Sequence, residues 1–402
     1  MTESERKQII ALIQREVIPA IGCTEPIAVA YAAAVAVQAL GEKPESVEVN
    51  VSANIIKNVK SVVVPCTGGL RGIGAAVCAG IVAGCPEKEL EILEEITGEQ
   101  KVEMKKMLDT MPMTIRESDK EYIFDIQIKA CAGGHSGYVE IAGFHTNVIC
   151  VKKDDEIIRE KAYEEQGSSC ATDRSLLTVE KIIEFADCVD VADVEEVLQR
   201  QIDYNWAIAE EGMTGNWGAA IGKTLMEAYG NSVHNRAKAM AAAGSDARMN
   251  GCELPVVINS GSGNQGMTTS LPVIVYAKEL NVSKEMMLRA LVVSNLITIH
   301  MKTGIGRLSA YCGAISAGCG AGAGICYLYG GRAYEISHVI VNAVAINSGV
   351  VCDGAKASCA AKIASAVEAG LLGLQMQKNG KQFYGGDGLV EKGVENTIRN
   401  IG

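Results

Sequence analysis

Two hydrophobic patterns divide the chain. Residues 46–52 and 121–158 alternate apolar and polar positions with a period of two, as strands with one buried face do. Turn signals at 132–135 and 143–145 interrupt the second stretch, which predicts a β-meander. From Leu177 onward, apolar positions recur at helical spacing along most of the chain. The predicted helices cover residues 177–187, 191–201, 203–228, 232–243, 266–279, 283–299, 308–328, 333–346 and 354–374.

The chain begins with two further helical patterns, an amphipathic one over residues 4–19 and an alanine-rich one over 27–40. We therefore predict an α+β fold with two parts. A smaller α/β lobe, containing an antiparallel sheet, is expected at residues 41–175. A large, mainly helical catalytic domain is expected to combine residues 1–40 and 176–402 and to carry the functional site. A chain of 402 residues is long enough for this division.

The composition refines this picture. Apolar residues make up 48% of the chain, but aromatic residues make up only 4%, and there are 43 glycines. The core must therefore be built from small side chains, which suits close packing of helices and would permit a homodimer. The net charge of -11 argues against nucleic-acid binding, because no basic patch is available to meet phosphates.

No segment of the sequence predicts a membrane protein. The longest uncharged run, residues 308–331, is long enough to span a bilayer, but it is rich in glycine and poor in large apolar residues. We expect it to be buried in protein. The N-terminus is polar and lacks the apolar run of a signal peptide, so a soluble, cytoplasmic protein is expected.

Fourteen cysteines in a cytoplasmic chain do not predict a disulfide framework. Three of them, Cys312, Cys352 and Cys359, lie in the glycine-rich stretch from Tyr311 to Cys359. Their spacing leaves two interpretations open, a metal centre or a tightly packed core in which cysteine acts as a small apolar residue. The zinc-ribbon and ferredoxin spacings are absent. Three cysteines would leave one iron of a four-iron cluster open to act as a Lewis acid.

Cys23 is a candidate reactive thiol. It precedes the alanine-rich helix, and Pro26 suits the first turn of that helix. The partial positive charge at a helix N-terminus lowers a thiol pKa, which would favour the thiolate. A buried structural cysteine is an equally good interpretation of this position.

A polar, glycine-rich turn opens the helix that is predicted at residues 266–279. Because its backbone N–H groups and polar side chains can hold a small carboxylate, we expect a substrate site there, with a purely structural turn as the alternative. The turn matches neither a phosphate-binding loop nor a dinucleotide fingerprint. The candidate residues are Ser260, Ser262, Gly263 and Asn264.

Basic residues precede the cysteine stretch and also lie within it. His300, Lys302 and Arg307 come just before Cys312, where their charges would balance a thiolate-bound cluster. The alternative is an ordinary helix C-terminus, where such residues are common.

Four motifs together resemble the iron–sulfur L-cysteine desulfidase family, which is related to the α chain of the iron–sulfur L-serine dehydratases. The resemblance spans nearly the whole chain and is specific only when the motifs are taken jointly. Its members convert L-cysteine to pyruvate, ammonia and sulfide with a [4Fe-4S] cluster and without pyridoxal phosphate. The motifs are Gly22-Cys23-Thr24-Glu25-Pro26, Ser260-Gly-Ser-Gly-Asn-Gln-Gly266, Tyr311-Cys312-Gly-Ala and Cys352-Asp353-Gly-Ala-Lys356-Ala-Ser-Cys359.

The resemblance implies roles for individual residues. One [4Fe-4S] cluster per chain would be bound by Cys312, Cys352 and Cys359, and Cys23 would be the general base that removes the α-proton. The open iron would bind the substrate carboxylate, and the glycines around the cysteines would make room for the cluster. The substrate-binding residues are then expected to be Ser260, Ser262, Gly263, Asn264, Lys302 and Lys356.

The implied function is a carbon–sulfur lyase that degrades L-cysteine. The same chemistry on L-serine or L-threonine is the nearest alternative. The Ser-Ser-Ser-His-Thr stretch of the dehydratases has no counterpart here, which favours cysteine. The sequence is also compatible with a protein that binds cysteine without turning it over, and with a metal-free protein that has buried thiols.

Overall fold

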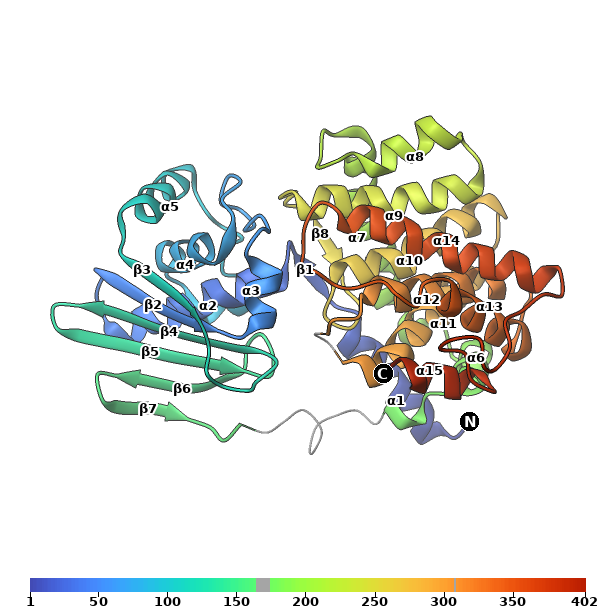
Figure 1. Ribbon diagram of the computed structural model, residues 1–402, viewed down its shortest axis with the longest axis horizontal. Coiled ribbons are helices and arrows are strands. Elements are labelled where there is room, and N and C mark those ends of the chain that lie inside the picture. Colours follow the sequence, from blue (N-terminus) through green and yellow to red (C-terminus); the bar gives the residue numbers. More distant parts are fainter. Residues whose placement is uncertain (164–173, 307–308) are drawn as a thin grey trace.

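The computed structural model describes residues 1–163, 174–306 and 309–402. A smaller lobe of strands and helices lies beside a larger helical lobe (Figure 1). This arrangement confirms the predicted α+β class. The chain begins and ends in the helical lobe, where α1 (Glu3–Glu16) and α15 (Val394–Ile401) lie. No described helix is both long enough and apolar enough to cross a membrane.

A six-stranded sheet organises the smaller lobe, with the strand order β3-β2-β4-β5-β6-β7. Neighbouring strands are antiparallel except β2 and β3, which are parallel. The predicted alternation is present in β2, where Val47, Val49 and Val51 are buried and Glu48 is exposed. The strands are β2 (Ser46–Val51), β3 (Met113–Glu117), β4 (Asp125–Ala132), β5 (His135–Ala142), β6 (Val148–Lys153) and β7 (Glu156–Glu160).

Helix α2 (Thr24–Leu40) lies between this sheet and α4 (Gly72–Ala83). A side chain at Gly137 of β5 would meet the backbone oxygen of Ala36 at 2.1 Å, and one at Gly80 of α4 would meet that of Ala30 at 1.9 Å. The small residues of α2 therefore allow close contact on two sides. The predicted division placed residues 1–40 in the helical domain, but the packing joins α2 to the smaller lobe, with α3 (Ala53–Val59) and α5 (Gly98–Thr110).

The helical lobe is built around α12, which contacts α10, α11, α13 and α14. Side chains at Gly318 and Gly320 would meet backbone oxygens of α14 and α11 at 2.3 and 2.5 Å. These glycines serve helix packing and do not make room for a cluster. The helices are α6 (Val179–Cys188), α7 (Ala192–Thr214), α8 (Ile221–Tyr229), α9 (Val233–Met249), α10 (Gly263–Glu279), α11 (Lys284–Ile305), α12 (Gly313–Leu328), α13 (Ala333–Ile346) and α14 (Cys359–Lys378).

The predicted helix at 203–228 is not continuous. Helix α7 runs through the expected break near residue 202 and ends at Thr214, and α8 starts only at Ile221. The chain turns between them, where Gly218 and Ala220 have positive φ angles of 54° and 50°. Residues with left-handed backbone angles do not continue a right-handed helix, so the segment between α7 and α8 turns.

Candidate active site between the lobes

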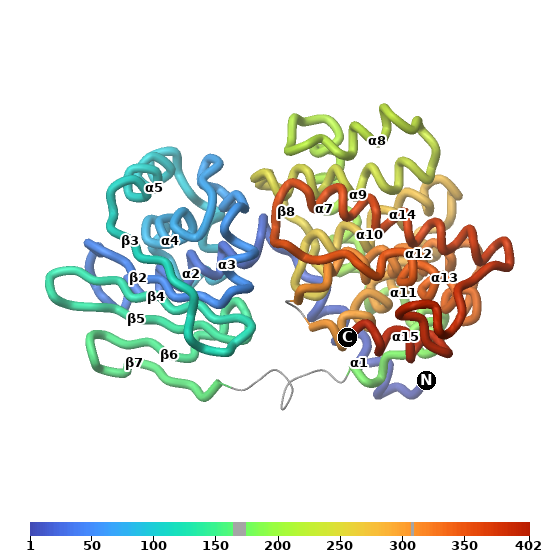
Figure 2. The backbone as a smooth tube through the Cα atoms, viewed as in Figure 1, coloured from blue at the N-terminus to red at the C-terminus, as the bar shows by residue number. Residues whose placement is uncertain are grey.

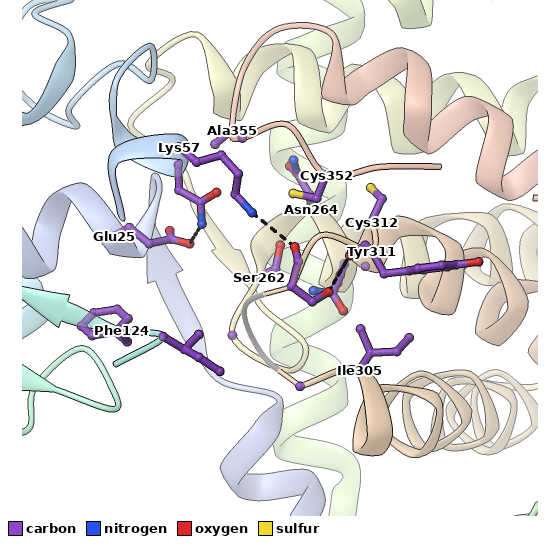
Figure 3. Close-up of a pocket in the computed structure, with 18 of the residues that line it drawn as sticks. Glu25, Lys57, Phe124, Ser262, Asn264, Ile305, Tyr311, Cys312, Cys352 and Ala355 are labelled. Atoms are coloured by element: carbon purple, nitrogen blue, oxygen red, sulfur yellow. Dashed lines mark hydrogen bonds between the residues drawn. The ribbon is translucent and has the colours of Figure 1, made fainter. Parts of the chain in front are cut away.

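A cavity of about 450 Å³ is lined by residues of both lobes. The helical lobe contributes the three predicted ligands, Cys312, Cys352 and Cys359, which we call the cluster cysteines. The smaller lobe contributes Glu25, Lys57 and Phe124 from the opposite side (Figure 3). The predicted ligands are therefore brought to one site, although the sequence placed no part of the smaller lobe there.

Backbone pairing holds two of the cluster cysteines together. The N–H of Cys312 donates to Val350 at 3.2 Å, and that of Cys352 donates to Ala310 at 2.7 Å. Tyr311 and Val351 form the antiparallel bridge between these bonds. Cys312 caps α12, and Cys359 is the first residue of α14. Two helix starts and one paired loop therefore fix the positions of the three thiols.

The donor set fits an iron–sulfur cluster better than a single ion. Within the described ranges, no three His, Cys, Asp or Glu side chains are close enough to share one metal ion. A four-iron cluster does not require this, because each thiolate binds a different iron. Burial raises the pKa of Cys312 and of Cys359, so bringing thiolates here requires positive charge nearby.

Two lysines supply part of that positive charge. Lys302 of α11 is 2% exposed and lines the cavity, and its burial lowers its pKa to about 8, an effect that Cys352 and Cys312 oppose. Lys362 of α14 also lines the cavity, and its pKa is raised by Asp353, Cys312 and Cys359 against the effect of its burial. Lys302 was predicted here, whereas Lys362 was not.

The other predicted basic residues are His300, Lys356 and Arg307. His300 pairs with Glu395 at 2.7 Å and is not among the described residues that line the cavity. Lys356 pairs with the Asp353 carboxylate and is not among the described residues that line the cavity. Arg307 lies outside the described residues. Lys362 follows Cys359 by three positions, which is the spacing that places two side chains on one face of a helix. This spacing is the signal that could have identified Lys362.

Cys23 lies in the wall of the same cavity. A short sheet joins β1 (Pro19–Ile21) to β8 (Pro255–Val257) and so brings the segment before α2 beside the loop before α10. Cys23 lies at the start of α2, as predicted, where it is the N-cap residue, but it is only 2% exposed. The prediction of a lowered pKa is wrong, because burial raises the pKa of this thiol to about 12. Loss of hydration outweighs the opposing effect of the nearby Arg248.

Some residues of the predicted substrate loop line the cavity, and others are buried behind its wall. Ser262 and Asn264 line the cavity at the start of α10, and the Ser262 side chain makes no capping hydrogen bond. Ser260 is buried, and its hydroxyl donates to Asn259 Oδ1 at 2.9 Å. Gly263 lies under Arg248, where a Cβ would come within 2.4 Å of Nε. Ser262 and Asn264 are thus the loop residues that can face a substrate.

Two cavity residues gave no signal in the sequence. Arg248 lines the cavity from α9, and Lys57 donates from Nζ to the backbone oxygen of Ser309 at 3.3 Å, joining the lobes (Figure 3). Neither residue belongs to a recognisable motif. Each is a single basic residue on a helix, whose role depends on the tertiary fold.

Similar proteins place the chain in a family. Residues 87–402 match the serine dehydratase alpha chain family. A UPF0597 protein of Desulfitobacterium hafniense is 58% identical over 391 residues, which cover 97% of this chain and 91% of that protein. A UPF0597 protein of Lachnoclostridium phytofermentans is 49% identical, over 98% of this chain and 94% of that protein. A UPF0597 protein of Fusobacterium nucleatum is 42% identical, over 100% of this chain and 95% of that protein.

The matched family region contains the cluster cysteines, Lys302 and Arg248, whereas Cys23 lies before it and is covered by the whole-chain relatives. The site therefore combines residues inside the matched region with residues that precede it. On these matches and on the convergence of the cysteines, the chain belongs to the serine dehydratase alpha chain family of iron–sulfur, lyase-type enzymes, among its UPF0597 members.

Proposed function

We propose that the protein is an iron–sulfur lyase that degrades L-cysteine to pyruvate, ammonia and hydrogen sulfide by α,β-elimination. The observation that carries the proposal is the convergence of the three cluster cysteines on one cavity, beside Cys23 and two lysines. Family membership supports the reaction class, and the absence of the dehydratase Ser-Ser-Ser-His-Thr stretch supports cysteine as the substrate.

The expected cofactor is one [4Fe-4S] cluster bound by Cys312, Cys352 and Cys359. When bound, it supplies a Lewis-acidic iron without a protein ligand, next to which a soft thiolate leaving group is favoured. Lys302 and Lys362 offset the negative charge that three thiolates and an anionic substrate bring into the cavity.

The reaction requires removal of one proton and one sulfide from L-cysteine. Loss of the α-proton and of the β-sulfur gives aminoacrylate, which tautomerises to the imine, and water then releases pyruvate and ammonia. Proton transfer by a positioned side chain contributes roughly 10²–10⁴-fold to such a step. Cys23 and Lys302 are the candidate acceptors for the α-proton, because both line the cavity.

The two candidates differ in their protonation. Cys23 is a neutral thiol at neutral pH, because burial raises its pKa to about 12. Lys302, with a pKa of about 8, is partly neutral in mildly alkaline solution and can then accept a proton. The resemblance assigns the role to Cys23, so substitution of each residue in turn is needed. The acceptor is the residue whose loss removes solvent exchange of the substrate α-proton.

The alternative substrate is L-serine, which the description of the family favours, or L-threonine. Anaerobic assay of the reconstituted protein with each amino acid, following pyruvate or 2-oxobutyrate and sulfide, distinguishes these substrates. We expect sulfide and pyruvate from L-cysteine in equal amounts and faster than any product from serine. Equal or faster turnover of serine would overturn the substrate assignment.

A protein that binds cysteine without turnover is the alternative of another class. It would change the spectrum of the reconstituted protein on addition of L-cysteine, but it would release neither sulfide nor pyruvate.

A further inference from the structure

Arg248 is a buried cation that has only neutral hydrogen-bond partners among the described residues. It is 5% exposed and lines the cavity. One terminal nitrogen, Nη2, donates to the backbone oxygen of Gly22 at 2.7 Å, and Nη1 donates to Asn264 Oδ1 at 3.3 Å. Its Nε has no hydrogen-bond partner in the described parts of the chain. A guanidinium that is removed from water without an anion is costly, so this position is suited to an anion from solution.

The start of α10 lies against the same guanidinium. Ser262 makes no capping bond with its side chain, so the N–H groups of the first turn are available to an anion. A Cβ at Gly263 would lie 2.4 Å from Arg248 Nε, which places the orphaned nitrogen directly over the first residue of the helix.

The position of Arg248 relates this anion site to the reaction. Arg248 donates to the backbone oxygen of Gly22, the residue before Cys23, and it lines the same cavity as Cys23 and Cys359. In an α-amino acid, the carboxylate is one bond from the carbon that loses its proton. A carboxylate at Arg248 would therefore place that carbon near Cys23 and leave the β-substituent free to approach the cluster.

We propose that Arg248, Asn264 and the N-terminus of α10 bind the α-carboxylate of the substrate. The inference rests on the proposed function for the identity of the substrate, but the anion site can be tested without turnover. It differs from the expectation that the open iron binds the carboxylate. Arg248 would then make the site specific for substrates with a free carboxylate. The open iron of a bound cluster would be available to the leaving group.

The test compares two ligands that cannot undergo elimination. L-Alanine carries the carboxylate, and L-alanine methyl ester lacks its charge. Binding of both to the anaerobically reconstituted protein is measured by calorimetry, with wild type and with R248Q and R248K. Loss of a buried charge pair costs roughly 100-fold in affinity, so we expect R248Q to bind L-alanine about that much more weakly. The weak binding of the ester should not change.

Arg236 offers a matched control on the same helix. It is paired with Glu279 and does not line the cavity, so R236Q should bind L-alanine as wild type does. R248K keeps the charge but loses the planar guanidinium with its paired N–H donors. We expect this change to weaken L-alanine binding roughly 10-fold. Circular dichroism and iron content establish that each variant is folded and loaded.

Wild-type affinity for L-alanine in folded R248Q would overturn the assignment, as would equal losses for L-alanine and its ester. If R248Q does not fold, R248K replaces it in the test, and wild-type affinity for L-alanine in folded R248K would overturn the assignment. The proposed function fails separately, if wild-type protein releases no sulfide from L-cysteine while its binding of L-alanine still depends on Arg248.

Discussion

Gly354 joins the loop of the cluster cysteines to the smaller lobe. It lies between Cys352 and Cys359 and has a φ of 103°, which residues other than glycine rarely adopt. A Cβ at this position would lie 2.1 Å from the backbone oxygen of Lys57 in α3. The substitution G354A therefore introduces backbone strain and a clash with an atom that cannot rotate away.

The cost can be bounded from these two effects. A residue held in a sparsely populated φ region costs about 1–3 kcal/mol. Insertion of a methyl group into a filled contact costs about 1–3 kcal/mol more. The variant would lose about 2–6 kcal/mol if the contact were kept. Since moving the loop away from α3 relieves the clash, we expect a displaced loop, a lower midpoint of urea unfolding and less bound iron.

Urea unfolding followed by circular dichroism measures the first effect, and iron content after anaerobic reconstitution measures the second. G349A is the matched control, because Gly349 lies in the segment just before Cys352, and a Cβ there would meet nothing within 4 Å. Its stability should stay within about 0.5 kcal/mol of wild type. If G354A matches G349A in both measurements, α3 does not pack on the cysteine loop and the reasoning is refuted.

Three further predictions concern the thiols and a buried carboxyl. Alanine in place of any cluster cysteine should reduce bound iron, whereas C319A, a change in the fully buried core of α12, should keep it. If Cys23 and not Lys302 accepts the α-proton, C23A should abolish sulfide release but keep the iron, and loss of iron would make Cys23 a ligand. Burial raises the pKa of Asp246 from 3.8 to about 6, so its carboxyl should destabilise the fold increasingly as pH rises through this interval, by up to about 3 kcal/mol above it. D246N should remove this pH dependence of unfolding. If wild type and D246N show the same change in urea midpoint between pH 4 and 8, the raised pKa of Asp246 is contradicted.

The sequence was most informative where a local pattern carries the signal. Alternation identified the strands around Val47 and Val49, and glycine-flanked cysteines identified the side of the cavity that Cys312 and Cys352 form. Helix positions followed from periodicity, but the break before Ile221 depended on two left-handed residues that periodicity does not encode.

The remaining features depend on tertiary packing. An all-round small-residue helix such as α2 has no polar face to indicate its neighbours, so its place against the sheet could not be predicted. The Cys23 prediction considered the helix start but could not include the burial that dominates its pKa. Arg248 and Lys57 carry no motif, and they acquire a role only because β1 pairs with β8 and α3 meets the cysteine loop.

The pairing of β1 with β8 also constrains the order in which the protein can fold. Pro19 lies opposite Val257, so β1 finds its partner strand only after more than half of the protein has been synthesised. The smaller lobe lies between these partners in sequence, as the course of the chain in Figure 2 shows. Domains generally fold as units during synthesis, and closing a long loop is entropically unfavourable. A lobe that folds first would shorten that loop, so the cavity would be completed late, when both lobes are already formed.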